Sequence, residues 1–91
     1  MIVRILGEGQ FRVDDAATAE LQKLDADLEV AVEQDDQQAL AAALGALLTQ
    51  ARRGAALPPD SLEPSDVIIP HEGATVAEVR KMLTDEGLIP G

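Results

Sequence analysis

The hydrophobic positions at the start of the chain follow the two-residue period of β-strands. Residues 2–6 are rich in β-branched side chains, and Phe11 and Val13 alternate with polar neighbours. The sequence Gly-Glu-Gly at 7–9 separates the two runs, and a short connection containing glycine is typical of a β-hairpin. We therefore expect a hairpin over residues 2–13. Its first run has apolar residues on both faces, which suits a central strand.

After the hairpin the apolar positions change to steps of three and four, which is the period of an α-helix. A polar break divides this stretch into two helices, and so short a break predicts an antiparallel αα-hairpin over residues 15–53. Asp14 can cap the first helix, Asp35 or Asp36 can cap the second, and Gly54 is suited to end it. The first helix should bury one stripe of side chains, which are Ala17, Leu21, Leu24, Leu28, Ala31 and Val32.

The last third of the chain alternates between turn-forming residues and short regular segments. Three prolines interrupt residues 54–66, which predicts a loop. Residues 67–69 form a short β-type run, which we expect to be a third strand. Thr75 and Glu78 have the spacing of a capping box and predict a helix over residues 75–86.

Together these elements predict an α+β fold: a single small domain over residues 1–91 with an N-terminal β-hairpin, a short third strand, a long αα-hairpin and a C-terminal helix. The chain has 27 large apolar side chains, enough for one modest core. The apolar ending, residues 88–91, should pack on that core.

Both long helices have more apolar surface than one core requires. Opposite its core stripe, the first helix carries a second apolar strip, which is less hydrophobic than the first. Residues 37–51 of the second helix contain no charged side chain. A helix without a charged face is usually buried on several sides. Either another chain covers it, or it lies between the first helix and the sheet with its alanines exposed. The candidate protein-binding residues are Ala19, Lys23, Ala26, Val30, Ala39, Ala42 and Ala46.

Negative charge is concentrated on the first helix and its flanks. The chain has a formal net charge of −10, and residues 14–36 hold nine acids and one lysine, a net −8. This is either a solvated face or a docking surface for a basic partner, with Asp25, Glu29 and Glu33 as its candidate residues. So acidic a chain, with one aromatic residue, is not suited to nucleic acid or to anionic membrane surfaces.

The sequence offers little that resembles catalytic or metal-binding chemistry. There is no cysteine, and His71, beside Glu72, is the only histidine, so a thiolate or histidine-cluster metal site is excluded. Asp25, Asp27 and Glu29 alternate as in a calcium loop, but they lie within a helical period that turns them apart. We expect no catalytic residue, no metal and no cofactor. Without a signal peptide or a membrane-length apolar run, the expected location is the cytoplasm.

Several segments resemble the PspA-associated protein (PspAA) family. They are the opening Met-Ile-Val-Arg-Ile-Leu-Gly-Glu-Gly-Gln-Phe-Arg-Val, the acidic helix from Asp14, the Ser-Asp-Val-Ile-Ile-Pro segment at 65–70 and the ending Glu-Gly-Leu-Ile-Pro-Gly at 86–91. Phe11 stands where we expect tyrosine in that family. The resemblance implies an accessory or regulatory partner of phage-shock protein A, a coiled-coil protein of the membrane stress response, with no enzymatic activity. It implies no site residues.

The leading hypothesis from the sequence is a non-enzymatic adaptor in the envelope stress response. It binds a helical partner, a phage-shock protein A homologue, through its two long helices, and it is recruited to the inner membrane face by that partner without inserting into the membrane. The alternative is a homo-oligomer that senses a small ligand between its sheet and helices. The least favoured hypothesis is an enzyme that uses His71 and Glu72 in catalysis.

Overall fold

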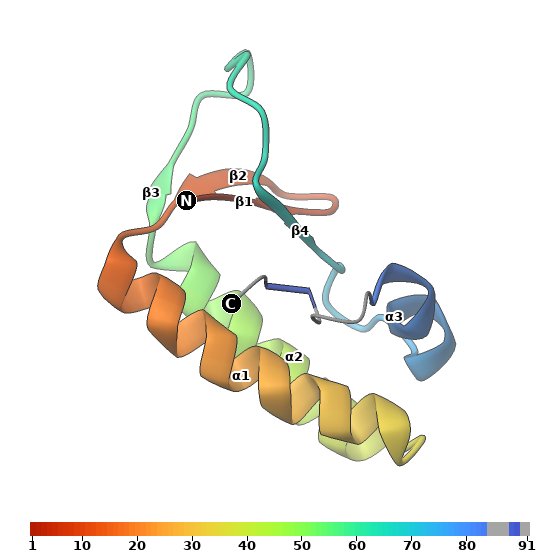
Figure 1. The fold of residues 1–91 in the computed structure, drawn as a ribbon. Coiled ribbons are helices and arrows are strands. Elements are labelled where there is room, and N and C mark those ends of the chain that lie inside the picture. Colours follow the sequence, from red (N-terminus) through yellow and green to blue (C-terminus); the bar gives the residue numbers. More distant parts are fainter. Residues whose placement is uncertain (84–87, 90–91) are drawn as a thin grey trace.

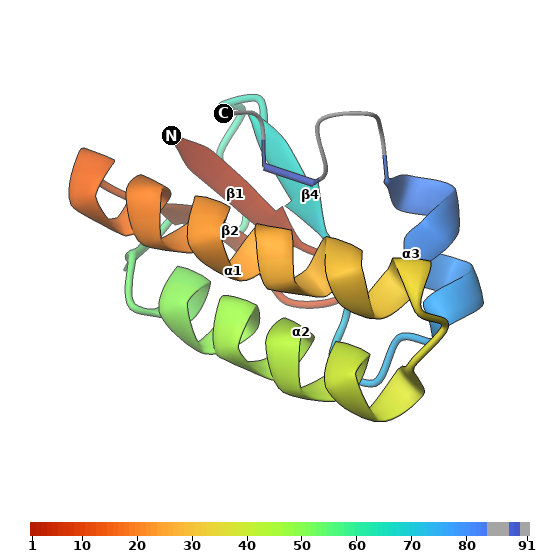
Figure 2. The same cartoon turned by 60° about the horizontal axis from the view of Figure 1, so that its bottom comes forward.

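The computed structural model describes residues 1–83 and 88–89, and it places a small sheet over a pair of helices (Figure 1). The helices α1 (Asp15–Glu33) and α2 (Gln37–Arg52) lie antiparallel on one face of the sheet. A shorter helix, α3 (Val76–Met82), lies at the end of this layer where α1 turns into α2 (Figure 2). The expected α+β fold class is confirmed.

The sheet has four strands in the order β3-β2-β1-β4. The strand β1 (Ile2–Ile5) pairs antiparallel with β2 (Gly9–Arg12) and parallel with β4 (Val67–Ile69), so it has a strand on each side, as its apolar faces suggested. The short β3 (Ala55–Ala56) pairs with the outer edge of β2. Residues 54–66 were expected to be a loop, extended in part, and β3 is a short strand within them that the sequence did not predict.

The loop of residues 57–66 joins the two opposite edges of the sheet and crosses the face that the helices leave open (Figure 1). Gln10, only 7% exposed, holds it in place: its Nε2 donates to the Glu63 carbonyl at 2.9 Å and to Ser65 Oγ at 2.7 Å. Asp66 accepts a hydrogen bond from the backbone N–H of Ile2 at 2.8 Å. The sheet is thus covered by helices on one face and partly by this loop on the other.

Local capping groups define where α1 and α2 begin. The Asp14 side chain accepts a hydrogen bond from the N–H of Ala17 at 2.8 Å, and Asp36 accepts one from the N–H of Ala39 at 3.0 Å. These bonds satisfy N–H groups that a helix cannot pair internally. Between the helices Asp35 takes a left-handed conformation with φ of 53°, which aspartate tolerates better than most residues and which turns the chain back.

One core fills the space between the sheet and the helices. Its side chains come from the inner face of the sheet, from the inward faces of α1, α2 and α3, and from Leu88 and Ile89. All six predicted stripe residues of α1 lie on this side, although Ala17 and Leu24 are half-buried. The expected packing of the apolar ending is confirmed at residues 88–89, and residues 90–91 lie outside the described part.

The helix α3 is shorter than predicted. Thr75 and Glu78 form the expected capping box, with each side chain bonded to the other residue's backbone N–H. Leu83 leaves the helix because its backbone is extended, with ψ of 138°, so α3 ends at Met82. The remainder of the predicted helix, residues 84–86, falls outside the described residues.

Candidate functional site

The outward side of the helical hairpin carries most of the residues expected to bind a partner. The buried apolar residues of α1 and α2 belong to the core that these helices share with the sheet, so the opposite sides of the two helices face away from the sheet (Figure 2). Val30, near the end of α1, is 49% exposed, and it is the one large apolar residue of a strip made mostly of alanines. We call this surface the helical face; its exposed members are Ala16, Ala19, Lys23, Ala26, Val30, Ala42 and Ala46.

The uncharged residues 37–51 of α2 lie on two different sides of the helix. One side holds the core residues Leu40, Leu44, Leu47 and Leu48. The opposite side holds Ala42 and Ala46, which are exposed and so remain available to another chain. Ala39, expected among the binding residues, is half-buried and packs against the core, so it offers less of its surface than its neighbours.

Asp25 does not lie on the acidic surface where it was expected. It is only 3% exposed, and its two carboxylate oxygens accept hydrogen bonds from the backbone N–H of Leu88 at 3.1 Å and of Ile89 at 3.0 Å. Burial raises the pKa of Asp25, while the hydrogen bonds from Ile89 and Leu88 oppose that shift. Because its hydrogen-bonding groups are used within the chain, Asp25 is a structural anchor and not a docking residue.

The other two acidic candidates, Glu29 and Glu33, follow Asp25 along α1. Glu33 is exposed and Glu29 is half-buried. Burial is the largest cause that raises the pKa of Glu29, and the nearby negative charges of Asp25 and Glu33 raise it further. The two glutamates therefore form an acidic edge beside the helical face, in which neighbouring negative charges repel one another.

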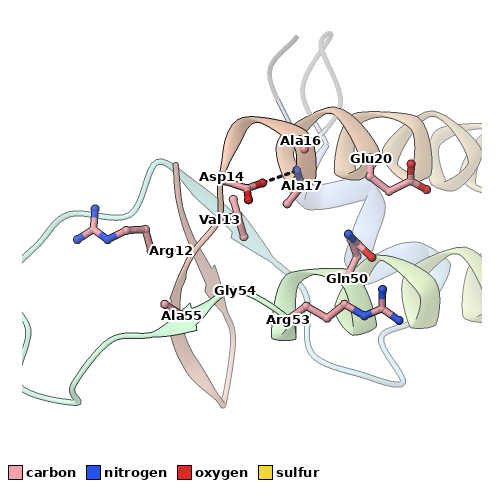
Figure 3. A pocket seen from close by; sticks show the side chains of 10 residues that line it. All are labelled: Arg12, Val13, Asp14, Ala16, Ala17, Glu20, Gln50, Arg53, Gly54 and Ala55. Atoms are coloured by element: carbon pink, nitrogen blue, oxygen red, sulfur yellow. Dashed lines mark hydrogen bonds between the residues drawn. The ribbon is translucent and has the colours of Figure 1, made fainter.

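A groove of about 850 Å³ continues the helical face at the open end of the hairpin (Figure 3). It lies where the start of α1 meets the end of α2 and β3, and Ala16 belongs both to the groove and to the helical face. Val13 and Ala17 give it an apolar wall, whereas Glu20 and Arg53 supply charges of opposite sign. Sequence periodicity could not reveal this groove, because it forms from segments about 40 residues apart.

His71 and Glu72 do not form the pair that an acid–base reading requires. His71 is exposed, with Nδ1 2.9 Å from the Glu72 carbonyl oxygen and Nε2 3.3 Å from Glu78 Oε2. Its pKa is raised by the Glu72 backbone contact and then by Glu78. The Glu72 carboxylate instead faces Arg52, at 3.4 Å, within an ion-pair group that also includes Glu8. These contacts support a structural role for the segment between β4 and α3, which contains both residues.

The fold and this surface define a small α+β protein with an exposed helical face of small side chains. The chain belongs to the family of PspA-associated proteins (PspAA), whose family profile matches residues 1–91, and membership links it to an accessory role beside PspA. No curated protein and no solved structure gives a significant match. Among the residues described, no helix has the length and apolar character needed to cross a membrane.

Proposed function

We propose that this protein binds a phage-shock protein A homologue through the helical face and acts by binding, not by catalysis. In this role it is a cytoplasmic regulator of the envelope stress response and reaches the inner membrane surface through its partner. The observation that carries the proposal is the exposed, charge-free side of α2 beside the α1 strip that ends at Val30. Membership of the PspA-associated family supports the choice of this partner.

The shape of the helical face fits a helical partner. Alanines dominate its exposed side chains, so a partner helix can approach the backbones of α1 and α2 closely. Val30 projects furthest among these apolar residues and can enter a hole between partner side chains. A coiled-coil protein, with its long exposed helices, presents that kind of surface.

Charge provides a second source of recognition. Glu20 and Asp27 are exposed beside the apolar strip, and Glu29 and Glu33 form the acidic edge on its other side. Acids around an apolar centre favour a partner with basic residues around an apolar stripe. The same acids would compete with anionic lipid for those basic residues, which offers a route to regulation. The affinity should therefore fall as salt concentration rises.

Titration calorimetry with the purified homologue tests the proposal. Val30→Glu and Ala42→Glu place a charge on the helical face, and each should weaken binding by about tenfold or more. Ile68→Glu is the matched control, because Ile68 is 46% exposed on the other side of the sheet. Circular dichroism should show an unchanged fold in all three variants.

The proposal fails if both helical-face variants bind as tightly as the unmodified protein. It also fails if Ile68→Glu weakens binding as much as Val30→Glu does, because the contact would then not be confined to the helices. A coiled-coil protein of unrelated origin should not bind, which separates specific recognition from general attraction to exposed helices.

A further inference from the structure

A second apolar surface lies on the opposite side of the molecule from the helical face. Of the four large hydrophobic residues exposed in the described part of the chain, only Val30 belongs to the helices. Leu6, Leu62 and Ile68 all lie on the outer side of the sheet. Because single exposed leucines are common, the arrangement of these three residues carries the argument, not their number.

Leu62 lies close to the turn at residues 59–60 of the crossing loop, which we call the loop tip. It is 98% exposed, and the loop rises away from the sheet on the side opposite the helices (Figure 1). The loop is restrained nonetheless. Its three prolines, at 58, 59 and 64, limit its backbone conformations. Gln10 donates a hydrogen bond to the Glu63 carbonyl, and Arg12 forms an ion pair with the Glu63 carboxylate. A restrained loop loses little entropy on binding, so an exposed apolar side chain at its tip is suited to insert into a partner.

The outer face of the sheet supplies a matching surface. The crossing loop covers Gln10 and touches Arg4 through Ser65, but it leaves Arg4 and Ile68 exposed. These two residues are directly opposite each other in the β1–β4 register. Leu6, 38% exposed, follows β1 two residues after Arg4, and the alternation of side chains along a strand, continued by one residue, puts it on the same side as Arg4. We call Arg4, Leu6 and Ile68 the sheet patch. It is a small apolar surface with one cation.

Charges on the two surfaces are complementary. Arg4 donates only to Ser65 Oγ, at 3.3 Å, among the contacts described, and no carboxylate pairs with it there. Asp60 is exposed two residues before Leu62 and has no ion pair among the described residues. The loop tip thus combines an apolar side chain with an acid, whereas the sheet patch combines apolar side chains with a base. The loop tip and the sheet patch lie on the same side of the molecule. That side of one copy is therefore complementary to the same side of a second copy.

We propose that two copies of this chain associate through this side, each inserting Leu62 against the sheet patch of the other and pairing Asp60 with the other copy's Arg4. Such a contact is isologous, because each copy contributes the same two surfaces. The dimer is small and therefore weak. It leaves both helical faces exposed, so it does not compete with binding at those faces.

Sedimentation equilibrium of the full chain over a wide concentration range is the primary test. We expect a reversible monomer–dimer equilibrium, weakened about tenfold or more by Leu62→Ser, since two leucines leave the contact. Val30→Ser is the matched control on the helical face and should leave the equilibrium unchanged. Leu62 makes no contribution to the core, so its substitution tests the contact without unfolding the protein.

Two further variants test the pairing itself. Arg4→Glu and Asp60→Lys should each weaken the dimer, and the double variant should recover part of the loss because the charges are exchanged. A mixture of Leu62→Ser with Ile68→Lys should form a heterodimer more readily than either variant forms its own dimer, because one of its two contacts is intact.

A protein that remains monomeric at all accessible concentrations would overturn the proposal. So would a dimer that Leu62→Ser leaves intact, or one that Val30→Ser abolishes. These outcomes do not bear on binding of the phage-shock protein A homologue, which uses the opposite face and is measured separately.

Discussion

The carboxylate of Asp25 on α1 holds the backbone N–H of Ile89, 64 residues later in the chain, at 3.0 Å. The adjacent N–H of Leu88 bonds to the other oxygen of the same carboxylate at 3.1 Å. Leu88 and Ile89 in turn place their side chains in the core. A single buried acid therefore attaches the end of the chain to the middle of its longest helix, and polar and apolar contacts reinforce each other there.

Replacing Asp25 with alanine should destabilise the protein by about 2–4 kcal/mol, because two buried N–H groups lose their acceptors. Urea denaturation measures this change in the free energy of unfolding. Amide hydrogen exchange should accelerate first at Leu88 and Ile89, since the end of the chain is released before the rest of the core. Asp27→Ala is the control: Asp27 is exposed on the same helix, so its loss should change stability by no more than about 0.5 kcal/mol. Equal stability of the two variants would contradict the anchoring role.

The same carboxylate should make stability depend on pH. Burial raises the pKa of Asp25, so the native protein holds this proton more tightly than the unfolded chain does. As pH rises from about 4, the ordinary aspartate value, to the raised native pKa, the contribution of Asp25 to stability should therefore fall. The stability difference between the unmodified protein and Asp25→Asn should shrink across that range.

Carboxyl-carbon NMR titration checks this prediction at the level of the residue. The midpoint for Asp25 should lie above the ordinary aspartate range, and a midpoint within or below that range would show that the hydrogen bonds outweigh burial. In Asp25→Asn the pKa of Glu29 should also fall, because the Asp25 charge is one of the causes that raise it.

The sequence predicted what local interactions decide and missed what distant segments decide. Asp14, Asp36 and Thr75 cap their helices through bonds to residues three positions ahead, which a short stretch of sequence reveals. The burial of Asp25 depends on residues 88–89, so helical periodicity alone assigned it to the surface. Likewise β3 consists of two alanines, which have little preference for strands, and it exists because the edge of β2 provides hydrogen-bonding partners.

Gly54 is a further residue whose role depends on distant contacts. It was expected to end α2, and it does follow that helix, but its importance lies in packing. A Cβ at this position would lie 2.6 Å from the carbonyl oxygen of Arg12 and 3.0 Å from a methyl carbon of Val13. Gly54→Ala should therefore force β2 away from the end of α2 and destabilise the protein by about 1–3 kcal/mol.

A second glycine provides the control for this substitution. Gly45 lies within α2, and a Cβ there would meet no atom within 4 Å. Gly45→Ala should stabilise the protein by about 0.5–1 kcal/mol, because alanine favours the helix. Thermal denaturation should therefore shift in opposite directions for the two glycine-to-alanine variants, and a shift in the same direction would refute the packing argument.

Gln10 should control the position of the crossing loop. Gln10→Leu keeps a similar volume but removes the Nε2 donor, which leaves the Glu63 carbonyl and Ser65 Oγ without that partner. We expect the free energy of unfolding to fall by about 1–2 kcal/mol, and protease cleavage within residues 57–64 to become faster, because the loop is freed from the sheet.

The control variant is Glu63→Ala. It removes only the exposed ion pair with Arg12 and keeps the Glu63 backbone carbonyl, so it should lower stability by no more than about 1 kcal/mol. If Glu63→Ala releases the loop and Gln10→Leu does not, the surface ion pair and not the buried amide holds it. If Gln10→Leu acts as expected, the dimer proposed above should weaken with it, since a free loop no longer holds Leu62 in a fixed position.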